Sequence, residues 1–134
     1  MPNWCENTIE FYCEEGEIDK VIEFLKGTRT TQDALSGEYE YEEKEFCFDS
    51  IRPEPHNVEE LGGWYEWRMR NWGCKWEPNI EYFERVDDHQ LCVGLSTAWC
   101  PPERIFDAIQ EKFPDLEIDW FYKEQGMRLA GWLG

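Results

Sequence analysis

The stretch PPERIFDAIQEKFPDLEIDWFYKE, residues 101–124, decides the fold because it joins one helix directly to one strand. Two prolines at its start suit the first turn of a helix, and Pro114 ends that helix. Its apolar side chains recur at helical spacing, at positions 105, 106, 109 and 113. We expect residues 116–124 to form a strand that turns at 125–126 and pairs with the terminal residues.

The segments before this stretch continue the alternation of strands and helices. Residues 80–86 and 90–97 are strand-like runs on either side of a short polar turn, which predicts a hairpin. Near the N-terminus, TIEFYC (residues 8–13) alternates apolar and polar residues as a half-buried strand does. Residues 18–26 then follow helical spacing until Gly27, which predicts the first helix.

The middle of the chain carries mixed signals. Residues 28–37 are polar and typical of a loop, whereas 38–51 alternate as one or two strands, the first strongly acidic. Asn57 is a good helix cap with Glu60 as its capping-box partner, which predicts a helix over residues 58–71.

Together these elements predict an α+β fold of the ferredoxin-like type. The order strand, helix, strand, strand, helix, strand (βαββαβ) forms an antiparallel sheet with two helices on one face. We expect a single domain over residues 1–134. A helical insert at about 53–79 interrupts it and contains the inserted helix around residues 58–71.

The charge of the chain restricts its partners. Thirty acidic residues against 13 basic ones give a net charge of −17 and an isoelectric point near 4.4. Such a surface repels phosphate, so direct binding of nucleic acid is not expected. No apolar run reaches the roughly 20 residues that span a membrane, and the N-terminus lacks the pattern of a secretory signal. We therefore expect a cytoplasmic protein that does not bind membranes.

Catalytic and metal-binding patterns are weak in this sequence. The six cysteines include no C-x-x-C pair, and several lie in strand-like runs, which favours free structural thiols over a zinc site. His56 and His89 lie in polar turns, and nothing in their spacing orients either one for catalysis. We predict no catalytic residues, no metal and no cofactor.

The acidic strand is the first candidate binding surface. Its residues are Glu38, Glu40, Glu42, Glu43 and Glu45, with Tyr39 and Tyr41 between them. Carboxylates on one strand face lie ~6.6–6.8 Å apart, close to the phosphate spacing along one DNA strand. Two interpretations stay open: the charges protect a sheet edge from aggregation, or they face a partner.

A tryptophan cluster between residues 64 and 76 is the second candidate. It consists of Trp64, Trp67, Arg68, Asn71, Trp72, Lys75 and Trp76. One interpretation is a second aromatic core that docks the insert onto the sheet. In another, Trp64 anchors a protein interface, since Trp and Arg are favoured there. In a third, the remaining six residues line a small-ligand pocket.

Four phrases of the sequence together resemble the ferredoxin-like family of phage and conjugative-plasmid proteins typified by YubB. They are MPNWCENTI (1–9), WYEWRMRNWGCKW (64–76), STAWCPP (96–102) and FPDLEIDWFYKEQGMRLAG (113–131). The resemblance implies the ferredoxin-like fold and a source on a mobile genetic element, and it implies no reaction. This sequence departs from it at Cys74 and Cys100, where threonine and serine are expected. Neither cysteine is therefore expected to act as a ligand or nucleophile.

These observations lead to a functional hypothesis with two alternatives. The first is a non-enzymatic accessory protein of a phage or plasmid in the cytoplasm of the host cell. Its acidic surface would bind a host protein with a basic, nucleic-acid-binding surface, such as a CRISPR complex, by mimicking nucleic acid. The alternatives are a small-ligand or regulatory module that uses the tryptophan-lined pocket, and, third, an enzyme.

Overall fold

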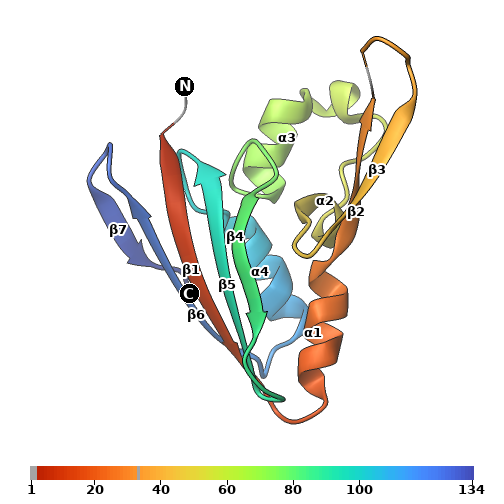
Figure 1. The fold of residues 1–134 in the computed structure, drawn as a ribbon. Coiled ribbons are helices and arrows are strands. Elements are labelled where there is room, and N and C mark those ends of the chain that lie inside the picture. Colours follow the sequence, from red (N-terminus) through yellow and green to blue (C-terminus); the bar gives the residue numbers. More distant parts are fainter. Residues whose placement is uncertain (1–2, 33) are drawn as a thin grey trace.

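The computed structural model describes residues 3–32 and 34–134 (Figure 1). A five-stranded antiparallel sheet has the strand order β4-β5-β1-β6-β7, and β2 and β3 form a separate hairpin. The strands are β1 (Trp4–Tyr12), β2 (Gly27–Gln32), β3 (Tyr39–Lys44), β4 (Asn79–Arg85), β5 (Gln90–Ala98), β6 (Glu117–Glu124) and β7 (Leu129–Trp132). The helices are α1 (Glu17–Leu25), α2 (Phe48–Ile51), α3 (Trp64–Asn71) and α4 (Glu103–Lys112), with a 3-10 turn η1 (Val58–Leu61).

The predicted ferredoxin-like fold is confirmed. The elements β1, α1, β4, β5, α4 and β6 follow the βαββαβ order, and β1 lies between β5 and β6, antiparallel to both. β7 adds a fifth strand at the edge next to β6. The segment between α1 and β4 contains the β2–β3 hairpin, α2, η1 and α3, so it starts earlier than the helical insert expected at about 53–79.

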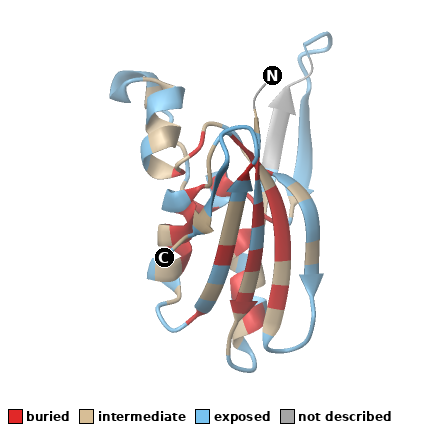
Figure 2. Cartoon of the chain, turned by 90° about the vertical axis from the view of Figure 1, so that its left-hand side faces the viewer, coloured by how far each residue is buried: buried red, intermediate tan, exposed pale blue. Residues whose placement is uncertain are grey.

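The core lies between the sheet and the pair α1 and α4. Ile18, Val21 and Leu25 of α1 are fully buried, as are Ile105 and Ile109 of α4, each set at helical spacing. Along the strands, buried and exposed residues alternate (Figure 2), as expected for a sheet with one covered face. Burial of each such aliphatic side chain stabilises the fold by about 1.5–3 kcal/mol.

A hydrogen-bonded polar group lies inside this core. The indole N–H of Trp120 donates to Oδ1 of Asn7 (3.0 Å), and Nδ2 of Asn7 donates to Oγ1 of Thr97 (3.0 Å). The Thr97 hydroxyl donates in turn to the carbonyl oxygen of Cys100 (2.7 Å). The group ties β1 to β5, to β6 and to the loop before α4, and each polar atom is satisfied, as burial requires.

The expected loop over 28–37 is partly wrong, because its first residues belong to β2. β2 pairs in register with β3, and we call this hairpin the arm. Gly27 begins the arm where it passes α2: a Cβ there would lie 2.5 Å from Cβ of Ser50, so only glycine fits without movement. Figure 1 shows the arm continuing from the end of α1 and projecting away from the sheet.

The second half of the expected strand region 38–51 is also different. Strand β3 ends at Lys44, and Phe46 and Phe48 turn into the core, where α2 begins. Aromatic alternation alone does not separate a strand from a short buried helical turn. The acidic strand therefore lies outside the five-stranded sheet.

The single helix expected over residues 58–71 is replaced by η1 and α3. Gly62 and Gly63 have φ values of 103° and 96°, in the left-handed region, and this interrupts the helix. The side chain of Asn57 makes no capping hydrogen bond, so the capping box with Glu60 is absent. Within the described residues, no helix is long and apolar enough to cross a membrane.

Candidate partner-binding arm and groove

The arm presents its acidic strand to solvent. Every residue from Glu38 to Glu43 is exposed, and Tyr39 and Tyr41 expose 60% and 72% of their surface to solvent. Within the described residues, no third strand pairs with the arm. Carboxylates on a two-stranded ribbon of this kind are accessible from both faces.

The distribution of charge on the arm is less one-sided than the sequence indicates. In β3, Glu40, Glu42 and Lys44 share one face. The Lys44 ammonium lies 3.0 Å from a carboxylate oxygen of Glu42, which offsets part of its charge. Glu38 precedes the strand and Glu45 follows it, so the predicted carboxylates extend beyond β3 at both ends.

The base of the arm is held by a carboxylate that sequence reasoning missed. Glu77 accepts hydrogen bonds from the backbone N–H groups of Phe48 (2.6 Å) and Asp49 (2.9 Å), at the start of α2. The Cys47 thiol also approaches it, at 3.6 Å. Burial raises the pKa of the Glu77 carboxyl above its ordinary value, although the backbone N–H donors oppose this shift. These contacts connect the arm base to the segment before β4.

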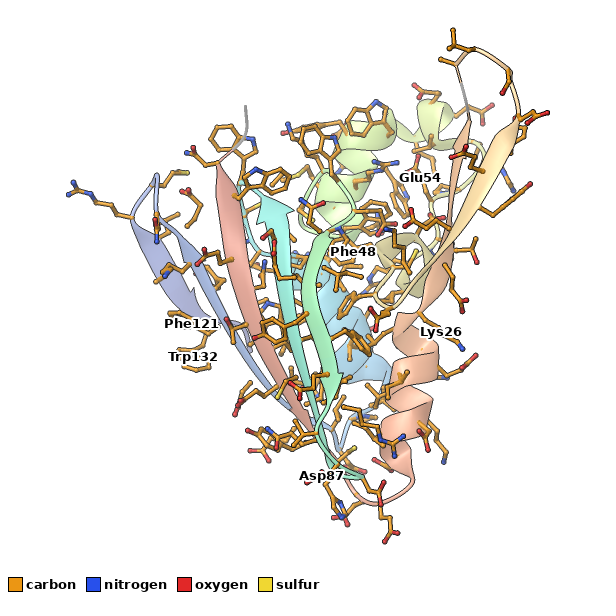
Figure 3. All side chains as sticks on the ribbon, viewed as in Figure 1. Lys26, Phe48, Glu54, Asp87, Phe121 and Trp132 are labelled. Atoms are coloured by element: carbon orange, nitrogen blue, oxygen red, sulfur yellow. The ribbon has the colours of Figure 1, made fainter. Side chains whose placement is uncertain are left out.

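A groove of about 560 Å³ lies at the base of the arm. Thr28 and Cys47 line it from the arm side, and Arg68 lines it from α3. Figure 3 shows Glu54 in this region, between α3 and the arm. Asp49, Glu54 and Glu77 contribute carboxylates to the lining, and no sequence signal marked them as a group.

Arg68 is the main basic group of the groove, and its contacts fix it in place. Its Nε donates to Oε2 of Glu54 (2.6 Å) in a half-buried ion pair, and Nη1 donates to the carbonyl of Lys75 (3.1 Å). Its guanidinium carbon lies 5.0 Å from the ring centroid of Trp64 and 4.8 Å from that of Trp72. Such stacking favours a positive charge at this position.

Only part of the predicted pocket lines the groove. Arg68, Trp72 and Trp76 take part in the lining, whereas Trp67, Asn71 and Lys75 are absent from it. Their contacts are different: Trp67 packs edge-on against Trp72, Asn71 donates to the Trp67 carbonyl (2.8 Å), and the Lys75 ammonium lies 4.1 Å from the Trp76 ring.

Trp72 and Trp64 lie mainly outside the groove. Trp72 is almost fully buried in the core, and its indole N–H donates to the carbonyl of Arg52 (2.9 Å). Trp64 is 40% exposed and lines a separate hollow with Tyr65 and Met69, a hollow that includes no arm residue. The structure therefore does not bring Trp64 together with the acidic arm.

The thiols and imidazoles are not arranged as a reactive site. The six cysteines are free, and burial raises the pKa of Cys5 and Cys47 to about 11. His56 lines the groove with an exposed side chain, and His89 lies in the β4–β5 turn with Nδ1 3.0 Å from the Cys13 carbonyl. Over residues 3–32 and 34–134, no group of three or more His, Cys, Asp and Glu side chains is placed to hold a metal ion.

One comparison with known proteins matched the second half of the chain. Residues 71–133 match a family model described as a ferredoxin-like domain in Api92-like protein. The matched segment contains β4 to β7 with α4, and it excludes the arm. No curated protein and no solved structure matched the chain.

Proposed function

We propose that the protein is a non-enzymatic binding module whose acidic arm occupies a basic, nucleic-acid-binding surface of another protein. One observation carries the proposal: the carboxylates of β3 are exposed on a two-stranded hairpin that projects from a packed domain. A charged hairpin that only protected a sheet edge would belong to the sheet, and this one lies outside it.

The physical basis of the interaction is electrostatic. A net charge of −17 attracts a basic partner over a distance of about one Debye length and repels nucleic acid. At contact, Glu40 and Glu43 present carboxylates on opposite faces of β3, where Lys and Arg side chains that normally hold phosphates can pair with them. Tyr39 and Tyr41 add exposed aromatic surface beside these charges.

The choice of a host protein as the partner rests on the resemblance, whereas the basic surface on that partner is inferred from the charge of the arm. The phrases that resemble those of phage and plasmid proteins support a source on a mobile element. Such a protein acts in the cytoplasm of the host cell. Its target would be a nucleic-acid-binding host protein, and a defence complex of the CRISPR type is the most concrete case.

The proposal is tested by capture from host-cell lysate on the immobilised protein. We expect one nucleic-acid-binding protein, released by moderate salt and displaced by DNA or RNA. Glu40→Lys with Glu42→Lys on the arm should strongly reduce capture. Glu59→Lys with Glu60→Lys on η1 makes the same charge change at exposed residues away from β3 and should preserve it. Equal loss in both variants, or capture that resists salt, would contradict the proposal.

The groove supports a second candidate function, a small-ligand or regulatory module. Its volume of about 560 Å³ lies in the range of ligand sites, and Trp76 supplies an aromatic wall that is 38% exposed. A small molecule that binds there raises the midpoint of thermal unfolding of the wild type and not of Trp76→Ala. A broad metabolite panel without such a compound would count against this function.

A further inference from the structure

The open face of the five-stranded sheet carries a second feature that the arm does not explain. α1 and α4 pack on one side of the sheet, and along β1 the residues that point to the other side are Trp4, Glu6, Thr8, Glu10 and Tyr12. No helix covers this side in the part of the chain that the structure describes. Exposed sheet faces of soluble domains are usually polar, and this one is both aromatic and acidic.

Strand register places aromatic side chains in one row across the sheet. The row consists of Tyr82, Gly94, Thr8, Phe121 and Trp132, on β4, β5, β1, β6 and β7. Phe121 and Trp132 pack with ring centroids 5.1 Å apart, and Figure 3 shows the two side chains next to each other. The Tyr82 ring covers Gly94, where any Cβ would collide with it. Tyr82 and Trp132 still expose 46% and 68% of their surface.

The adjacent row is acidic. It consists of Glu84, Cys92, Glu10 and Asp119, on β4, β5, β1 and β6. Glu10 and Asp119 are direct cross-strand neighbours, an arrangement of like charges that destabilises a sheet. No ion pair joins Glu84, Glu10 or Asp119 to a cation of the described residues.

Two further contacts on this face involve Tyr12 and Lys123. Tyr12 donates its hydroxyl proton to Glu10 (2.7 Å); this hydrogen bond, then burial, and then the charges of Glu10 and Asp119 raise the pKa of Tyr12 to about 12. Lys123, on the same face, lies 3.4 Å from Glu6 and so does not neutralise the acidic row.

We infer that the open sheet face binds an arginine-rich segment of another protein. The guanidinium of arginine stacks on Tyr and Trp rings and also pairs with carboxylates. The ammonium of lysine stacks on such rings less well. Residues two apart on one strand lie ~6.6–6.8 Å from each other, so a guanidinium stacked on the aromatic row lies within reach of the carboxylate side chains of the acidic row. This surface is separate from the arm, and the inference holds whether or not the arm binds.

Charge excludes the two other obvious occupants. A second copy of the chain would bring one acidic row against another, with a net charge of −17 on each partner. A nucleic acid would place phosphates on the same carboxylates, although aromatic rows on sheets can stack bases. A cationic polypeptide satisfies both rows at once.

The experiment uses a poly-arginine peptide and a poly-lysine peptide of equal length, with binding measured by calorimetry and mapped by amide NMR shifts. We expect shifts along the aromatic and acidic rows, and binding of poly-arginine about threefold to tenfold tighter than that of poly-lysine. Trp132→Ala or Tyr82→Ala should weaken poly-arginine binding about threefold to tenfold. Neither side chain belongs to the buried core, so these variants should fold.

Charge variants distinguish binding at this face from general electrostatic attraction to an acidic protein. Glu10→Gln with Asp119→Asn should weaken binding about tenfold, whereas Glu59→Gln with Glu60→Gln, the same charge change on η1, should alter it less than twofold. Equal effects of the two pairs, equal affinity for both peptides, or self-association through this face would overturn the inference. Shifts confined to the arm would also overturn it and would leave the proposed function intact.

Discussion

Replacement of Asn7 by alanine should destabilise the protein severely, because this side chain joins three strands inside the core. Asn7 is 2% exposed and accepts the indole proton of Trp120, which is fully buried. It also donates to the Thr97 hydroxyl (3.0 Å) and to the Cys5 carbonyl (3.1 Å). The truncation removes the partners of all these groups at once, and water does not reach the site.

The expected loss can be worked out from these contacts. The orphaned indole N–H of Trp120 costs about 1–3 kcal/mol, since it keeps its desolvation penalty without a hydrogen bond. Loss of two further hydrogen bonds, to Thr97 and Cys5, costs roughly 0.5–1.5 kcal/mol each. We therefore expect Asn7→Ala to lower the free energy of unfolding by about 2–6 kcal/mol, a large part of the total stability of a small domain.

Urea unfolding followed by tryptophan fluorescence measures this loss. Asn79→Ala, at an exposed position on the same sheet, is the matched control and should change stability by less than about 0.5 kcal/mol. In a Trp120→Phe background, which lacks the indole N–H, the cost of Asn7→Ala should fall by about 1–2 kcal/mol. A loss as small as that of the control, or the same loss in both backgrounds, would refute the reasoning.

Three further predictions concern local features. Gly73→Ala should lower the free energy of unfolding by about 2–4 kcal/mol in urea, because Gly73 has φ of 90° and a Cβ would lie 2.8 Å from the backbone nitrogen of Glu103. Gly16→Ala, at φ of 89° in open space, should lose only about 1 kcal/mol. Because the pKa of Glu77 is raised in the folded state, its contribution to stability should fall as pH rises from 4.5 through that higher value. Glu77→Gln should flatten this part of the stability–pH profile. Burial also raises the pKa of the Cys74 thiol, so alkylation followed by mass spectrometry should label partly exposed Cys92 first and Cys74 only upon unfolding.

The fold could be predicted from the sequence because its core elements carry strong periodic signals. The α4–β6 stretch combines a helical apolar face, a terminating proline and an alternating strand, and all three features appear in the structure. The hairpin of β4 and β5 and the helix α1 were equally clear. Local preference and tertiary packing agree in these segments, so the sequence pattern was sufficient.

The segment between α1 and β4 could not be predicted in the same way. The sequence of β2 is polar, and β2 belongs to a hairpin of only two strands. It therefore lacks the apolar alternation that marks a half-buried strand. The break between η1 and α3 depends on left-handed glycines, which a helical pattern tolerates in principle. The attachment of the arm base to Glu77 depends on hydrogen bonds between residues far apart in the sequence, and no spacing rule reveals those.

The two candidate sites differ in how much of each could be predicted. The acidic arm was identified by residue, because charge and alternation are local properties of β3. The tryptophan cluster was recognised as a group, but its division between core and groove was not. Trp72 is buried and Trp76 is partly exposed, yet both line the groove, whereas Trp67 does not, and local spacing does not separate them.

The salt dependence of binding to the captured partner tests the central claim most directly. Affinity should fall steeply as salt rises, and the slope of log Kd against log salt should be clearly shallower for Glu40→Lys with Glu42→Lys than for the wild type. Glu59→Lys with Glu60→Lys should keep the wild-type slope. Affinity that does not change with salt, or one slope shared by all three proteins, would contradict a role for the acidic arm in binding.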